Sequence, residues 1–111
     1  MWEEKLKLYD KLIENNSNFE RKGKTMPYTS VNGYMFSQLN KAGEIGIRLS
    51  KEQGQEFIKA HNSGPFLSYG AVMKDYVLIP ENILSNFELV SKLLEDSYNY
   101  TKSLPPKPTK K

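Results

Sequence analysis

The chain has 111 residues, of which 38% are hydrophobic and 26% are charged, so we expect one globular domain with a single hydrophobic core. No apolar run approaches the roughly 20 residues that a membrane-spanning helix needs, and the first residues lack the basic and apolar stretches of a signal peptide. A cytoplasmic protein without a membrane segment is therefore expected. The absence of cysteine excludes disulfides, thiolate nucleophiles and cysteine-ligated metal sites.

The net charge of +3 is concentrated at one end of the chain. Four of the 16 basic residues fall in the last ten positions, where there is no acid, and the remaining 12 face 13 acidic residues. These four are Lys102, Lys107, Lys110 and Lys111. We therefore expect one nearly neutral domain over residues 1–104 and a flexible tail rich in proline and lysine over residues 105–111.

Apolar residues at helical spacing predict a first amphipathic helix over about residues 2–15. Three antiparallel strands are predicted next, at about 28–31, 34–39 and 45–49. Asn32 and Gly33 stand between the first two, and both residues tolerate the positive φ of a tight hairpin turn.

The second half begins with Ser50, whose spacing to Gln53 is that of a capping box and predicts a helix over about residues 51–61. Two further strands are expected, at 66–73 and 76–79, joined by a tight turn at Lys74–Asp75. A second capping box at Ser85–Glu88 predicts a last helix over about residues 86–103.

The expected order of elements is α-β-β-β-α-β-β-α. Amphipathic helices and a half-apolar sheet each need to bury one side, so the sequence predicts a two-layer α+β fold with helices packed on an antiparallel five-stranded sheet.

No catalytic, metal or cofactor site is predicted. His61 is the only histidine in the sequence, so a histidine cluster for zinc is excluded within one chain. The candidates for interaction are instead aromatic and basic residues on or beside the predicted strands, whose alternative role is packing or solvated charge. They are Arg48, Lys74, Tyr28, Tyr34, Tyr69 and Tyr76.

Several segments together resemble the N-terminal domain of TfoX/Sxy-type competence regulators. The segments 72–80 (VMKDYVLIP), 98–100 (YNY) and 103–108 (SLPPKP) are similar to the end of that domain, and 33–36 (GYMF) and 46–49 (GIRL) are similar to its middle. The full-length regulators carry a second, C-terminal helical domain that the printed chain does not contain, and the family's glycine-rich stretch is not present near Met26.

The resemblance implies a two-layer fold similar to that of secretion chaperones. It also implies a regulatory, non-enzymatic role, since full-length relatives promote expression of DNA-uptake genes together with the cyclic-AMP receptor protein. We therefore expect a protein-interaction module with a protein partner, a homodimer being one form of that interaction. Two alternatives stay open: a weak electrostatic binder of nucleic acid through the basic tail, and a small-ligand-binding protein or enzyme with a pocket between helices and sheet.

Overall fold

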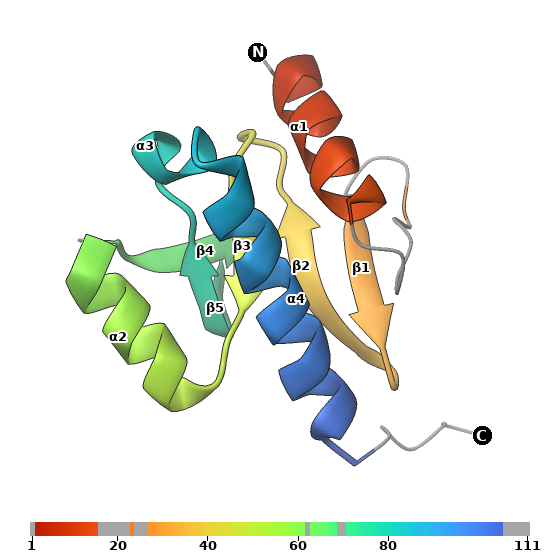
Figure 1. The fold of residues 1–111 in the computed structure, drawn as a ribbon, viewed down its shortest axis with the longest axis vertical. Coiled ribbons are helices and arrows are strands. Elements are labelled where there is room, and N and C mark those ends of the chain that lie inside the picture. The colour runs from red at the N-terminus through yellow and green to blue at the C-terminus, as the bar shows by residue number, and fades with distance from the viewer. Residues whose placement is uncertain (1, 16–22, 24–26, 62, 69–70, 106–111) are drawn as a thin grey trace.

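The computed structural model describes residues 2–15, 23, 27–61, 63–68 and 71–105 (Figure 1). These residues form four helices and five strands. In order they are α1 (Trp2–Glu14), β1 (Tyr28–Val31), β2 (Tyr34–Leu39), β3 (Ile45–Arg48), α2 (Lys51–His61), β4 (Pro65–Ser68), β5 (Ala71–Leu78), α3 (Glu81–Leu84) and α4 (Phe87–Ser103). The short helix α3 was not predicted.

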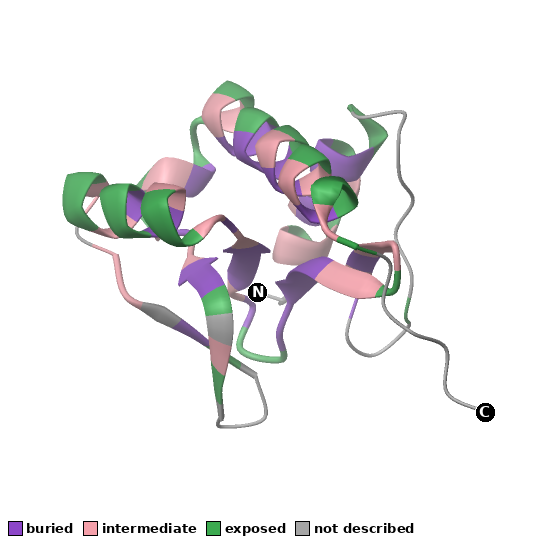
Figure 2. Cartoon of the chain, turned by 90° about the horizontal axis from the view of Figure 1, so that it is seen from below, coloured by how far each residue is buried: buried purple, intermediate pink, exposed green. Residues whose placement is uncertain are grey.

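The helices lie on one side of the strands, so the molecule has two layers (Figures 1 and 2). The main hydrophobic core fills the space between the helical layer and the sheet. It is formed by buried residues of α1, α2 and α4 with β2, β3 and β5, among them Tyr9, Leu12, Phe36, Ile45, Ile47, Phe57, Val77, Val90 and Leu94. The predicted α+β class and the antiparallel pairing of the strands are confirmed.

The five strands are connected in the order β1-β2-β3-β5-β4. Strand β5 pairs with β3 through residues 76–78, but its ladder with β4 is interrupted. Pro65 pairs with Val77 and Leu67 pairs with Val72, so Phe66 alone lies opposite the four residues 73–76. The structure therefore differs from the predicted regular sheet: β1, β2, β3 and β5 form its body, and β4 with the first part of β5 forms a two-stranded ribbon.

The predicted turn at Lys74–Asp75 is wrong. Strand β4 ends at Ser68 and β5 runs without interruption from Ala71 to Leu78. Asp75 does have a positive φ of 70°. Because aspartate tolerates this conformation in a bulge as well as in a turn, the residue bends a continuous strand instead of ending one.

Of the predicted hairpin turn and the two predicted helix caps, the turn and the first cap are confirmed and the second cap is wrong. Asn32 and Gly33 have φ of 55° and 83°, as the predicted hairpin turn requires. The hydroxyl of Ser50 accepts a hydrogen bond of 3.2 Å from the Gln53 backbone N–H at the start of α2. Helix α4, however, is capped by Asn86, which accepts from the Leu89 N–H, because Ser85 already ends α3.

A second, smaller cluster lies on the face of the sheet opposite the helices. Ile47 belongs to the main core, so its neighbour Gly46 faces the other way. The ring of Phe66 covers Gly46 and stacks on Tyr76 with 6.0 Å between ring centroids. Phe66 is fully buried although it is not part of the main core. The β4–β5 ribbon therefore folds over this face and seals part of it.

Candidate binding surface around β5

The structure brings three of the six predicted interaction residues together. Arg48 pairs with Tyr76 in the β3–β5 ladder, and its guanidinium lies over the Tyr34 ring at 5.3 Å from the centroid. Tyr28 is separate, since it lies on β1 opposite Gln38. Tyr69 and the side chain of Lys74 lie outside the described part of the structure.

Tyr76 is held as a neutral hydrogen-bond donor. Its hydroxyl donates to the Met35 carbonyl at 2.6 Å, and only 8% of the residue is exposed. Burial raises the pKa of Tyr76 well above the ordinary value of 10.0, and the nearby positive charge of Arg48 opposes this only in part. The phenol therefore links β5 to β2 and does not supply a proton acceptor near neutral pH.

Arg48 is mostly buried and positioned from several sides. Its side chain is 20% exposed, and its Nη2 lies 3.8 Å from an oxygen of Asp75. Within the described residues its Nε has no hydrogen-bond partner. The Ser97 hydroxyl of α4 also donates to the backbone carbonyl of Arg48. The guanidinium is thus fixed beside Asp75 at the point where β5 bulges.

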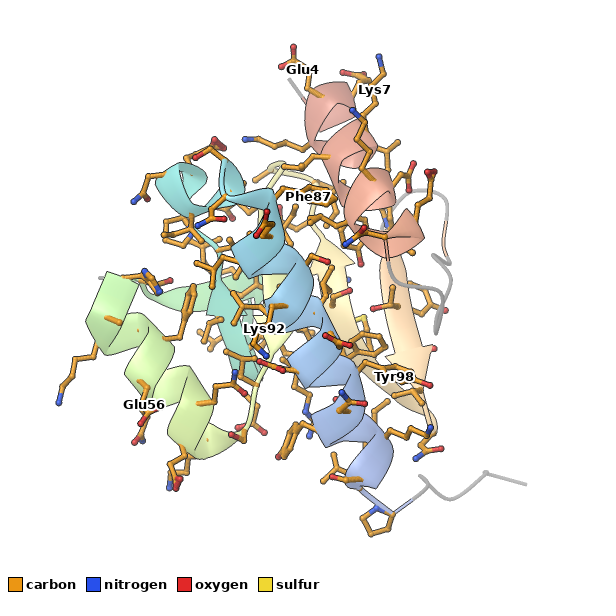
Figure 3. The ribbon with its side chains drawn as sticks, in the orientation of Figure 1. Glu4, Lys7, Glu56, Phe87, Lys92 and Tyr98 are labelled. Carbon is orange, nitrogen blue, oxygen red and sulfur yellow. The ribbon has the colours of Figure 1, made fainter. Side chains whose placement is uncertain are left out.

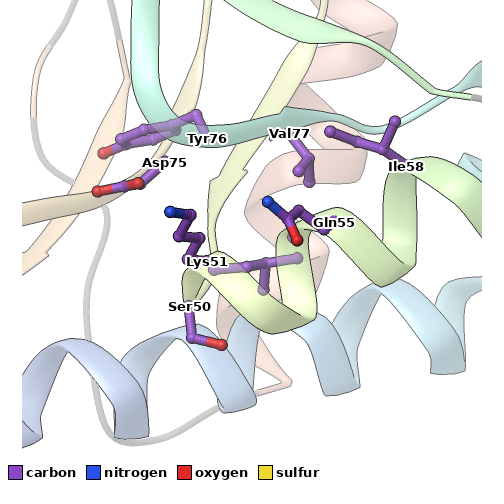
Figure 4. Close-up of a pocket in the computed structure, with 9 residues that line it drawn as sticks. Ser50, Lys51, Gln55, Ile58, Asp75, Tyr76 and Val77 are labelled. Carbon is purple, nitrogen blue, oxygen red and sulfur yellow. The ribbon is translucent and has the colours of Figure 1, made fainter.

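A shallow groove opens next to this pair, between α2 and β5 (Figure 4). Its volume is about 170 Å³. Its apolar lining comes from Leu49, Gly54, Ile58, Tyr76 and Val77, and its polar lining from Ser50, Lys51, Gln55 and Asp75. In Figure 4, Lys51 and Gln55 rise from the helix toward the strand that carries Asp75. Opposite charges therefore line one groove over an apolar floor.

The β4–β5 ribbon carries a different kind of surface. Leu67 and Val72 pair directly across the two strands, and they are 44% and 64% exposed. Among the described residues they are the exposed large hydrophobics. The side-chain amide of Asn40 donates to the Leu67 carbonyl at 2.9 Å, which ties the ribbon to the end of β2. Below, "apolar pair" means Leu67 and Val72.

Sequence reasoning missed the apolar pair, Asp75 and the α2 side of the groove as functional candidates. Leu67 and Val72 belonged to one predicted strand, in which they cannot face each other. A weak signal was present, because Gly70 stands between two apolar stretches and glycine often interrupts regular structure. The groove has no comparable local signal, since α2 and β5 meet only in the folded chain.

Within the part of the chain that the structure describes, no group of three or more His, Cys, Asp or Glu is placed to hold a metal ion. None of the described helices is long and apolar enough to cross a membrane.

Comparison with models of protein families, with curated proteins and with solved structures finds no match to this chain.

Proposed function

We propose that this chain is a non-enzymatic protein-interaction module and that the apolar pair on the β4–β5 ribbon is the centre of its contact surface. The observation that carries the proposal is the exposure of Leu67 and Val72 as direct cross-strand neighbours. Such neighbours have Cβ atoms about 5 Å apart, so a single partner side chain can cover both. Covering them removes apolar surface from water, which contributes about 1 kcal/mol for each side chain.

The contact is made by side chains more than by the backbone of β4. The Leu67 carbonyl already accepts a hydrogen bond from the Asn40 amide, which reduces its capacity to accept from an added strand. Strand β4 is also short and begins with proline, which has no N–H to donate. These features oppose the pairing of another chain's strand along β4 and leave the apolar pair as the binding element.

A second copy of the chain is the simplest partner. A two-fold contact would place the ribbon of one copy against the ribbon of the other, so that each apolar pair covers its equivalent. The resemblance to TfoX/Sxy N-terminal domains supports a regulatory role in the cytoplasm, with a fold similar to that of secretion chaperones. A heterologous regulatory protein would use the same surface.

Affinity capture from nuclease-treated extract tests the proposal. The chain is compared with the double variant Leu67→Gln/Val72→Thr, which keeps strand-compatible side chains while removing the apolar surface. Glu56→Gln, on the exposed side of α2 (Figure 3), is the matched control. The expected result is a defined protein, or a second copy of the chain, that the wild type and the control retain and the double variant loses. Equal retention by all three would contradict the proposal.

Nucleic-acid binding through the basic tail is a second candidate, favoured by the absence of acid from the last ten positions. A chain ending at Pro105 tests it. This end point keeps the Lys102 and Leu104 carbonyls that Asn32 binds and the Pro105 carbonyl that the Tyr34 hydroxyl binds at 2.8 Å. Salt-dependent binding of duplex DNA that is lost in the shortened chain would support this candidate, and unchanged binding would refute the tail mechanism.

A further inference from the structure

The groove between α2 and β5 contains a glycine that packing does not require. Gly54 lies in the interior of α2, where glycine costs about 1 kcal/mol relative to alanine. A Cβ at this position would be 3.7 Å from Val77 Cγ1 and 3.9 Å from Leu49 Cβ, which are ordinary contacts. Its φ is not positive either. What glycine provides here is open space above the apolar floor of the groove.

Two of the polar side chains around this space, Lys51 and Gln55, are not used by the fold. Lys51 and Gln55 are one helical turn apart and exposed, and neither makes a hydrogen bond or ion pair within the described residues. Asp75 on the opposite wall has Arg48 as its charged neighbour, at 3.8 Å, which is longer than a hydrogen bond. A cation, an amide and a carboxylate therefore remain available to a ligand from two sides (Figure 4).

We infer that this groove binds a small zwitterion with an apolar side chain, that is, a free α-amino acid of about the size of leucine. The Asp75 carboxylate would accept hydrogen bonds from the ligand's ammonium. Lys51 and Gln55 would donate to its carboxylate, and the side chain would lie over Gly54, Ile58 and Val77. A ligand with one charge alone would contact only one of the two oppositely charged side chains, Lys51 or Asp75.

The size of the groove agrees with this class of ligand. Its volume of about 170 Å³ is close to that of a cavity of about 150 Å³ that accepts benzene. Pockets for nucleotides and drug-sized molecules begin at about 300 Å³. The inference does not depend on the proposed interaction function, because none of the residues that line the groove belongs to the apolar pair.

Titration of the full chain with L-leucine tests the inference, followed by NMR at the methyl groups of Leu49, Ile58 and Val77. We expect saturable shifts with a dissociation constant of about 1 mM. Two analogues each lack one charge: 4-methylpentanoate has no ammonium and 3-methylbutylamine has no carboxylate. An ion pair between exposed groups strengthens binding by at most about fivefold. Because each analogue loses one such pair, both are expected to bind about three- to fivefold more weakly than leucine.

Two substitutions test which side chain binds which charge of the ligand, and a third is the control. Asp75→Asn keeps a residue that tolerates positive φ and should weaken leucine binding about three- to fivefold without weakening 4-methylpentanoate. Lys51→Gln should weaken leucine by a similar factor without weakening 3-methylbutylamine. Lys59→Gln, farther along the same helix, is the control and should change neither. The inference would be overturned if the methyl signals did not shift at leucine concentrations well above about 1 mM. It would also be overturned if neither Asp75→Asn nor Lys51→Gln weakened leucine binding.

Discussion

The ring of Phe66 occupies the space that a side chain on Gly46 would need. A Cβ built on Gly46 would lie within 3.0 Å of three atoms of that ring, closer than real Cβ atoms approach other groups. Phe66 has no exposed surface and stacks on Tyr76, so the ring has no room to move away. Gly46 is therefore the position at which the β4–β5 ribbon is closed onto the sheet, and this closure sets where the apolar pair is presented.

Gly46→Ala should destabilise the domain by about 1–3 kcal/mol, since it overpacks the cluster beneath the ribbon. Gly54→Ala is the matched control, because its added methyl meets only ordinary contacts and removes the cost of glycine in a helix. The control should be neutral or more stable by up to about 1 kcal/mol. Urea unfolding of both variants measures the difference. Equal stability of the two would mean that Phe66 does not pack on Gly46.

Tyr76→Phe should lose about 1 kcal/mol at neutral pH, because the Met35 carbonyl loses its buried donor. The pH dependence gives a sharper test. The pKa of Tyr76 is raised in the folded state above the ordinary 10.0, so the folded state favours the neutral phenol. Its contribution to stability is complete below pH 10.0 and decreases as the pH rises above that value.

Above this pH the unfolding free energy of the wild type should therefore fall more steeply than that of Tyr76→Phe, by up to about 1.4 kcal/mol per pH unit. Urea unfolding at several pH values on both sides of the tyrosine range measures the two slopes. Other tyrosines and lysines titrate in both proteins, so only the difference between the curves reports on Tyr76. Parallel curves would contradict its burial.

Asn32 joins the β1–β2 turn to the end of α4. It has a φ of 55°, and its side-chain amide donates to the Lys102 carbonyl at 2.8 Å. Asn32→Ala should cost about 2 kcal/mol, since alanine loses this hydrogen bond and is strained at positive φ. Asn32→Gly removes only the hydrogen bond and should cost about 1 kcal/mol. Thermal unfolding measures the stability of both variants. If Asn32→Ala were as stable as Asn32→Gly or more stable, the positive φ of Asn32 would not contribute to its role.

Ile47→Asp should unfold the domain, because it places an unpaired charge at a position with no exposed surface in the main core. Ile47→Val removes one methyl group and should cost only about 0.5–1.5 kcal/mol, with cooperative unfolding retained. Circular dichroism and urea unfolding distinguish these results. A folded, cooperative Ile47→Asp variant would mean that Ile47 does not face the helices.

Features that depend on neighbouring residues were predictable from the sequence. The turn at Asn32–Gly33 and the cap at Ser50 are confirmed, because each follows from what a few adjacent residues can do locally. Where two local solutions compete, the prediction failed. Asp75 was assigned to a turn but forms a bulge, and Ser85 was assigned to the start of α4 but ends α3. In both cases the strand or helix around the residue determines which of the two local structures forms.

The candidate site was predictable only in part. Arg48, Tyr34 and Tyr76 were singled out as separate candidates, but their meeting depends on the β3–β5 register and on the approach of β2, which no local pattern contains. The exposure of Leu67 and Val72 depends on the interrupted β4–β5 ladder, in which Phe66 lies opposite residues 73–76. When two paired strands contribute unequal numbers of residues, the positions that face each other are not separated by a fixed number of residues. The sequence therefore does not predict which of them meet.

The central claim is that the apolar pair contacts a protein partner. Amide hydrogen exchange, measured with and without the captured partner or at high and low chain concentration for self-association, tests it most directly. The account predicts slower exchange concentrated in the β4–β5 ribbon around Leu67 and Val72, with α1 and the exposed side of α2 unchanged. Slower exchange confined to the helices, with the ribbon unaffected, would contradict it.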